Sequence, residues 1–206
     1  MFNVKGDLKP LIKHMSKVQK RQIPFASANA INSTLFDIMK AEKYFLPKKL
    51  DRPTKYTMNA FKINKAKKTM LVGDIHVMPE RYKYLKYAIE GGTRTGNIGV
   101  PTKHAKLNKH GNIPKKWLGL IKNKNQFIAT LNNISGVWER GHYNKKGSFT
   151  SKGKSASTAL KLVVAFEKSV SYKKRFPFFK IAEKVARKNF QRNFKKSLAR
   201  AMATAR

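Results

Sequence analysis

The sequence predicts an α+β fold, with a small antiparallel or mixed sheet, N-terminal helices and a long C-terminal amphipathic helix. Apolar residues recur at three- and four-residue spacing near both ends of the chain, as they do on one face of a helix. Residues 60–78 alternate as in a hairpin, and residues 159–172 hold an apolar run typical of a buried strand. No Pro/Gly-rich linker divides the 206 residues, so we expect a single domain over 1–206.

Two helices are predicted in the N-terminal quarter. Residues 6–21 carry an amphipathic pattern, with Pro10 in the first turn, where its missing N–H costs nothing. Residues 23–46 form the second, with Pro24 at the first helical position. Its apolar stripe and its small residues favour close packing against another backbone.

The middle of the chain alternates between short elements and loops. After the hairpin, residues 80–92 form a short helix ended by two glycines, and residues 93–113 are expected to be a loop. Residues 113–123 suggest one or two helical turns, and residues 135–141 a strand. The Gly/Ser/Lys-rich stretch 142–158 is predicted to be a mobile basic loop before the strand 159–172.

The chain is strongly cationic. Lys and Arg number 46 against 10 Asp and Glu, for a formal net charge of +36. Such an excess indicates a polyanionic partner, either nucleic acid, an anionic membrane or an acidic protein surface, although some of the lysines can serve only to solvate the surface. Cysteine is absent, and the longest apolar run, residues 162–166, is far too short for a membrane span. We therefore expect a soluble protein without disulfides.

The predicted C-terminal helix, residues 177–206, combines an apolar stripe with a basic back and would be roughly 45 Å long. That length exceeds what a domain of this size covers alone, so part of the stripe is expected to meet another subunit or partner. An ordinary core helix with a solvated basic side remains a competing interpretation. A membrane-surface helix is a third, disfavoured because the stripe is rich in Ala and lacks Trp.

Residue patterns for catalysis are sparse. His104, Asn108 and His110 invite comparison with a nuclease metal site, but no carboxylate completes the set, and a loop role is preferred. The Gly-rich stretch 91–99 lacks the ending of a P-loop, and no serine lies in a nucleophile elbow. We expect no enzymatic activity, no metal and no cofactor. No DNA-reading motif is present, so any DNA contact would be to the backbone and steeply salt-dependent.

Several short motifs, in order, resemble the phage minor tail protein Z-like (tail-completion) family. They are FASANAIN at 25–32, DRPTKYTMNAF at 51–61, the 65–68 turn, EGG at 90–92, VP at 100–101, LNKHGNI at 107–113, GVWER at 136–140, RFPF at 175–178 and AMATA at 201–205. The resemblance covers nearly the whole chain, and departs from the family in the lysine richness and in the 142–158 loop. It implies a structural virion protein of the neck or tail end that helps to complete the tail and lets genome DNA enter it, without catalysis.

On this basis we expect a subunit of a homo-oligomeric ring or collar, located in the virion neck or tail, with portal, connector or tail-tube proteins and genome DNA as its partners. A free, sequence-independent nucleic-acid-binding protein is the alternative. The residues expected to contact DNA or an acidic partner are Lys145, Lys146, Lys152, Lys154, Lys173, Lys174, Arg175, Lys184, Arg187, Lys188, Arg192, Lys195 and Lys196. The residues expected at assembly interfaces are Phe25, Ile31, Phe178, Phe179, Phe190, Phe194, Leu198 and Met202.

Overall fold

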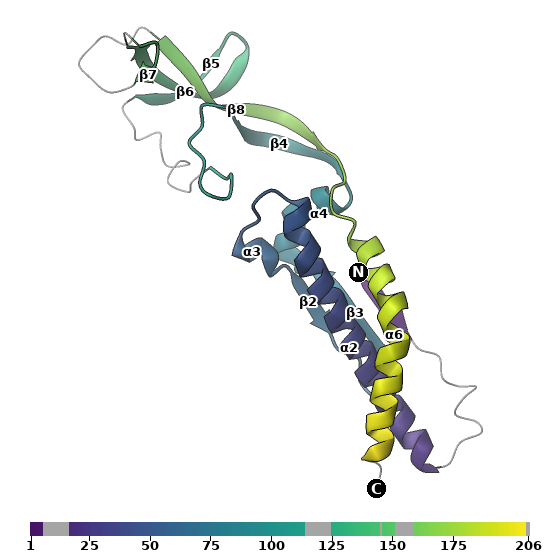
Figure 1. The fold of residues 1–206 in the computed structure, drawn as a ribbon. Helices are drawn as coiled ribbons and strands as arrows, with labels where there is room; N and C mark the ends of the chain where they lie inside the picture. Colours follow the sequence, from purple (N-terminus) through teal and green to yellow (C-terminus); the bar gives the residue numbers. More distant parts are fainter. Residues whose placement is uncertain (6–16, 114–124, 145, 151–158, 205–206) are drawn as a thin grey trace. The chain divides into compact units, whose positions relative to one another are not determined.

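The computed structural model describes residues 1–5, 17–113, 125–144, 146–150 and 159–204, which fall into two compact units (Figure 1). Unit 1 comprises Met1–Glu90 and Lys174–Arg206, and unit 2 comprises Gly91–Lys173. Helices occur together with antiparallel sheets, so the α+β class is confirmed. The sequence predicted a single domain, but the structure contains two compact units. Unit 2 is an insertion between two halves of unit 1, and the chain contains no composition change that marks its ends.

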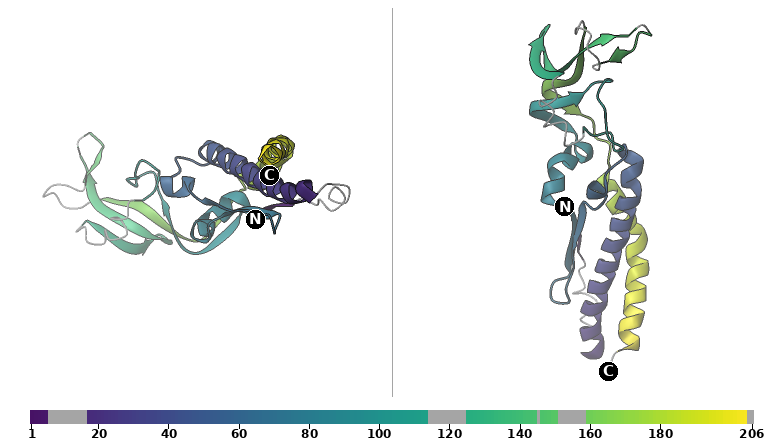
Figure 2. Two further views of the ribbon diagram at one scale, coloured as in Figure 1. Left: turned by 90° about the horizontal axis from the view of Figure 1, so that it is seen from below. Right: turned by 90° about the vertical axis from the view of Figure 1, so that its left-hand side faces the viewer.

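Unit 1 is built around two long helices, α2 (Lys17–Lys49) and α6 (Phe178–Ala203). They run antiparallel and side by side, as Figure 2 shows, and make the most extensive contact between any two described elements. The short helices α3 (Lys55–Met58) and α4 (Pro79–Ile89) complete the helical part. The backbone N–H groups of Arg175 and Phe176 both donate to the carbonyl oxygen of Ala88, which fixes the start of α6 against the end of α4.

The sheet of unit 1 has three antiparallel strands in the order β1 (Phe2–Lys5), β3 (Val72–Val77) and β2 (Phe61–Asn64). Strands β2 and β3 form the hairpin predicted for residues 60–78, with Ile63 opposite Ile75. A Cβ at Gly73 would lie 2.7 Å from Leu35 Cδ1, so this glycine lets α2 approach the sheet closely.

The core of unit 1 lies between these layers. Ile31, Leu35 and Ile38 of α2 are fully buried, and Ile75 of β3 is buried with them. Three aromatic rings close the core where α6 begins, because Phe61 lies 6.2 Å from Phe176 and 5.8 Å from Phe178 between ring centroids. Burial of this set is the main force holding the helices on the sheet.

Helix α2 corrects the boundary expected at Pro24. It is one continuous helix from Lys17 to Lys49, and Pro24 lies inside it rather than at its start. The missing N–H of an internal proline costs about 3 kcal/mol. Ile23 before it and Ala26 after it are fully buried, so burial on both sides of the proline offsets that cost.

Helix α6 corrects a second expectation. We expected its length to leave part of the apolar stripe without cover, but α2 is longer still and lies along it. Ala182 near one end and Ala201 near the other are both buried. Phe179 and Met202 are the residues of the stripe that stay largely exposed in the described part. The length of α6 is therefore no argument for a second subunit.

Unit 2 is a twisted antiparallel sheet of five strands. Four of them follow the order β4 (Gly92–Pro101), β8 (Ala159–Tyr172), β6 (Ile134–Tyr143) and β5 (Gln126–Leu131), and β7 (Phe149–Thr150) pairs with β6. Strand β8 confirms the strand predicted at 159–172, and β6 contains the one predicted at 135–141.

Strand β4 replaces the first part of the loop expected over 93–113, because its backbone pairs with β8 from Gly92↔Tyr172 to Pro101↔Val164. Residues 102–113 contain no helix or strand, as expected. Strand β7 likewise replaces part of the loop expected at 142–158. Of the helix expected over 6–21, residues 6–16 lie outside the described residues and residues 17–21 belong to α2. Residues 114–123 of the turns expected over 113–123, and the segment 151–158, also lie outside the described residues.

Candidate polyanion interface

Three neighbouring cavities line one side of the seam between α2 and α6. The first, of about 450 Å³, includes Asp37, Lys184, Lys188 and Arg192 in its wall. The second, of about 480 Å³, shares Asp37 and Arg192 with it. The third, of about 660 Å³, shares Ser33, Ser197 and Arg200 with the second. The shared walls make one continuous depression, which we call the seam groove.

The wall that α6 contributes to the seam groove is a regular row of cations. They are Lys184, Lys188, Arg192, Lys196 and Arg200. Residues four apart rise about 6 Å along a helix, so the row extends for about 24 Å. All five are exposed, and α2 and the β2–β3 turn add the exposed Lys40 and Lys65 to the opposite wall.

Asp37 is the only acidic residue among the described residues that line the groove. Its Oδ2 accepts hydrogen bonds of 3.0 Å from both Asn189 Nδ2 and Asn193 Nδ2, and lies 3.6 Å from Arg192 NH2. Asn193 is buried and also donates to Thr34 Oγ1 at 3.1 Å. The carboxylate is thus used to fix the register of α2 against α6, and the groove keeps a strongly positive balance of charge.

The structure brings together four of the predicted contact residues and separates others. Lys184, Lys188, Arg192 and Lys196 line the seam groove. Arg187 and Lys195 are exposed on α6 but do not line it, and Arg187 pairs with Glu183 at 2.7 Å.

The remaining predicted contact residues lie outside α6. Lys174 and Arg175 are exposed in unit 1 before α6, whereas Lys146 and Lys173 are exposed in unit 2. Lys145, Lys152 and Lys154 lie outside the described residues.

The predicted assembly residues are only partly available. Ile31 and Phe178 are wrong as interface residues, because both are buried in the core of their own unit. Phe190, Phe194 and Leu198 are half-buried along α6. Phe25, Phe179 and Met202 remain exposed, each between 39% and 47%.

Comparisons with family models, with curated proteins and with solved structures find no match to this chain. The interpretation of the seam groove therefore depends on its own geometry and on the resemblance noted in the sequence.

Sequence reasoning missed Lys40, Lys65, Arg200 and Asp37 as members of one site. Arg200 was detectable, because it continues the four-residue spacing that starts at Lys184. Lys65 was not, because it belongs to a turn that only the packing of the hairpin on α2 brings to the groove. The amide of Asn32 makes that contact by exchanging hydrogen bonds of 2.8 and 3.0 Å with the backbone of Ala66.

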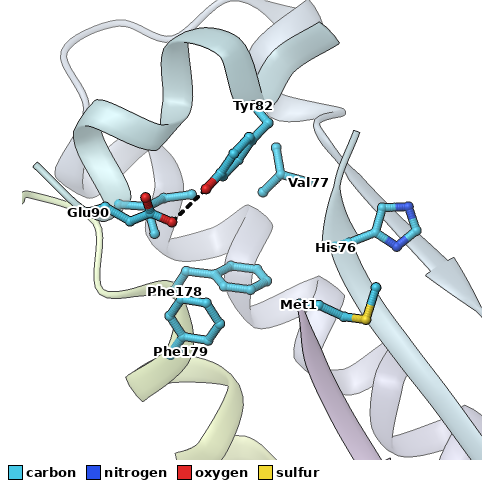
Figure 3. Close-up of a pocket in the computed structure, with 8 residues that line it drawn as sticks. Met1, His76, Val77, Tyr82, Glu90, Phe178 and Phe179 are labelled. Atoms are coloured by element: carbon cyan, nitrogen blue, oxygen red, sulfur yellow. Dashed lines mark hydrogen bonds between the residues drawn. The ribbon is translucent and has the colours of Figure 1, made fainter. Parts of the chain in front are cut away.

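A smaller cavity in unit 1, of about 210 Å³, is shown in Figure 3. Tyr82 OH donates to Glu90 Oε1 at 2.6 Å on one side of it, and Phe178 and Phe179 form the opposite wall. That hydrogen bond is the main reason that the pKa of Tyr82 is raised. Its described lining residues combine apolar side chains with His76, Tyr82 and Glu90, and include no serine or threonine.

The histidines do not assemble a metal site within the part of the chain that the structure describes, where no group of three metal-binding side chains occurs. His76 Nδ1 lies 2.8 Å from Asp74 Oδ2, and Asn64 Nδ2 donates to the same carboxylate. In unit 2, partial desolvation and the charges of Lys161 and Lys103 lower the pKa of His104.

The helices in the described part of the chain are too polar to cross a bilayer. What the seam groove offers chemically is a row of fixed positive charges in a shallow depression. Such a row binds a polyanion by replacing its counterions and gives no means of reading a base sequence.

Proposed function

We propose that this protein is a non-catalytic DNA-contacting structural protein, and that the seam groove meets the DNA backbone without sequence preference. The regular cation row from Lys184 to Arg200 is the observation that carries the proposal. Each lysine or arginine that meets a phosphate releases a condensed counterion, so binding weakens steeply as salt rises.

The resemblance to tail-completion proteins supports a place for this activity. We propose the neck or tail end of a phage particle, where a ring of such subunits would face genome DNA passing into the tail. Portal, connector or tail-tube proteins would be its neighbours there. Of the residues predicted for assembly, Phe179 and Met202 are exposed and line none of the three cavities of the seam groove, so they would remain for such contacts.

A salt titration of duplex DNA binding tests the groove. Changing Lys184, Lys188 and Lys196 to Gln should lower affinity at least tenfold and reduce the salt slope by about one unit per lost contact. The matched control changes Lys62, Lys67 and Lys68 to Gln, which removes the same charge from exposed positions of the β2–β3 hairpin. Equal losses in the two triple variants would refute the groove as the binding surface.

A free nucleic-acid-binding protein is the second candidate, and one observation favours it: α2 covers α6 along its length, so no other subunit is needed to shelter α6. Light scattering and mass spectrometry of purified particles separate the two candidates. The virion proposal requires the chain in particles of the phage that encodes it, together with self-assembly or assembly on a neck protein. A monomer that binds DNA tightly but is absent from the particles supports the alternative.

A further inference from the structure

The seam groove ends in a section unlike the rest, which we call the aromatic end and define by Phe25, Phe36, Lys65 and Arg200. Phe25 is 47% exposed and Phe36 is 38% exposed, although both belong to a helix with a large core to join. The other two cavities of the groove are lined by more charged side chains, and Phe45 is the single ring among their described lining residues. Exposed aromatic rings inside a cationic depression favour a ligand that is anionic and also has planar groups that can stack on the rings.

From this arrangement we propose that the aromatic end binds single-stranded nucleic acid, with unpaired bases stacked on Phe25 and Phe36. Proteins that bind single strands combine a positive groove for the backbone with aromatic rings for the bases. This inference rests on the proposed function, since it assigns to the same groove a strand type and a second kind of contact.

The distances within the aromatic end suit this ligand. Phe25 and Phe36 are eleven residues apart on α2, a rise of about 16 Å, which matches about five stacked nucleotides at the 3.4 Å spacing of one strand, or fewer when extended. Lys65 Nζ lies over the Phe36 ring, 5.5 Å from its centroid, so a base that stacks on that face would displace the ammonium toward the adjoining phosphate. Arg200 supplies the cation that lines the same cavity from α6.

The polar residues between the two rings carry no negative charge. Asn29, Ser33 and Ser197 line the cavity, and no carboxylate occurs among its described lining residues. Amide and hydroxyl groups hydrogen-bond to base edges without opposing the approach of phosphates. The cavity of about 660 Å³ is also the largest of the three that form the groove.

Duplex DNA cannot use the aromatic end in this way. Its bases are paired and stacked on one another, so their faces are closed to side chains, and only its phosphates can meet the cation row. The groove therefore has two parts with different preferences. The cation row serves either form of nucleic acid, and the aromatic end adds affinity for a single strand.

Fluorescence anisotropy tests the inference with a labelled oligothymidylate and a duplex that has the same number of phosphates. We expect the double variant Phe25→Leu/Phe36→Leu to bind the oligothymidylate about tenfold more weakly or worse, since stacking on aromatic side chains contributes 1–3 kcal/mol per base. Its binding to the duplex should change by less than about twofold, because the cation row is intact. Phe179→Leu is the matched control, an equally exposed ring outside the groove, and should change neither affinity.

A second measurement does not require the loss of a ring. In Phe25→Trp, added oligothymidylate should quench the new indole fluorescence, whereas added duplex should not, because only an unpaired base can stack on it.

Equal binding of both strand types by wild type and double variant would overturn the inference and leave the proposed function intact. Absence of any binding would overturn both. If the double variant loses affinity for polyglutamate but not for oligothymidylate, the aromatic end takes an acidic protein segment and the inference is wrong.

Discussion

Unit 1 buries its large apolar side chains between two long helices and a three-stranded sheet, whereas unit 2 is a sheet with few buried side chains. In the described part of unit 2, the buried hydrophobic residues are Ile98, Val163 and Val164. Leu160 and Ile128 of its strands are about half exposed. Unit 1 is thus held mainly by side-chain packing, and unit 2 depends more on its backbone ladders and on close contact between strands.

This difference can be measured with two probes. Trp138 lies on β6 of unit 2, so its fluorescence follows the unfolding of that unit. The described helices all belong to unit 1, so far-UV circular dichroism follows that unit. A urea titration followed by both signals gives a separate unfolding midpoint for each unit.

The largest effect is expected from Phe176→Ala in the core of unit 1. Phe176 is fully buried against Phe61, and removing such a ring costs about 3–5 kcal/mol. Leu160→Ala in unit 2, at a side chain 49% exposed, should cost less than about 1 kcal/mol. If Phe176→Ala does not fold, Phe176→Leu should lower the urea midpoint of the dichroism transition by a smaller amount and leave the fluorescence transition unchanged. Equal costs in the two units would show that side-chain packing contributes as much to the stability of unit 2 as to that of unit 1.

The next effect depends on pH and comes from Glu42 of α2. This side chain is fully buried, and neither carboxyl oxygen has a hydrogen-bond partner among the described residues. Burial raises its pKa from 4.5 to about 9. Between these values the unfolded chain loses the proton and the folded chain keeps it, so stability falls as pH rises through this window and is level above about pH 9.

Glu42→Gln should therefore gain stability relative to wild type as pH rises, by at most about 1.4 kcal/mol per pH unit and about 3 kcal/mol at pH 7. Urea midpoints at several pH values, followed by circular dichroism, provide the measurement. A constant difference between variant and wild type across this window would show that Glu42 is charged in the folded state.

Gly136→Ala is expected to damage unit 2 alone. A Cβ at Gly136 would collide with the carbonyl oxygen of Val164 in the neighbouring strand, and with Leu162 Cδ1 at 2.7 Å. Crowding of this kind costs about 1–3 kcal/mol, and here the obstacle is backbone, which yields little. The fluorescence transition should move to lower urea while the dichroism transition stays. Movement of the dichroism transition alone would contradict the prediction.

The smallest effect is expected from Asn193→Ala on α6. The change removes the donors to Thr34 and Asp37, and the loss of a buried hydrogen-bonding group costs about 1–2 kcal/mol. Gln191→Ala, an exposed position on the same helix, serves as the control and should be close to neutral. An unchanged urea midpoint in Asn193→Ala would mean that the polar contacts between α2 and α6 add nothing to stability.

Local patterns were sufficient for the elements whose own residues carry a periodic signal. The hairpin around residues 60–78, the strand β8 and the helices α4 and α6 all match their predicted places closely. Strand β4 could not be found in this way, because its sequence GTRTGNIGVP has no apolar alternation. It is a strand because β8, some seventy residues later in the chain, offers it a partner.

The two-unit organisation was hidden for a related reason. The chain enters unit 2 at β4 and leaves it at β8, and Gly92 pairs with Tyr172 where the two strands meet unit 1 in sequence. Paired strands need no Pro/Gly-rich linker, so the composition does not change at either boundary. One wall of the seam groove could be predicted from the sequence, because the cation row on α6 is a local pattern. The opposite wall, with Lys40 and Lys65, could not, because it depends on tertiary packing.

The insertion also has a consequence for biosynthesis. Helix α2 is translated early, but α6, which covers it, leaves the ribosome only after the whole of unit 2 has been made. At about 5–20 residues per second the delay is on the order of 10 s. Throughout that interval the side of α2 that α6 will cover stays exposed, while the strands of unit 1, which are already made, can cover its other side. Exposed apolar surface of this kind is what chaperones bind. A nascent chain stalled within residues 91–173 should therefore aggregate more readily than the completed chain.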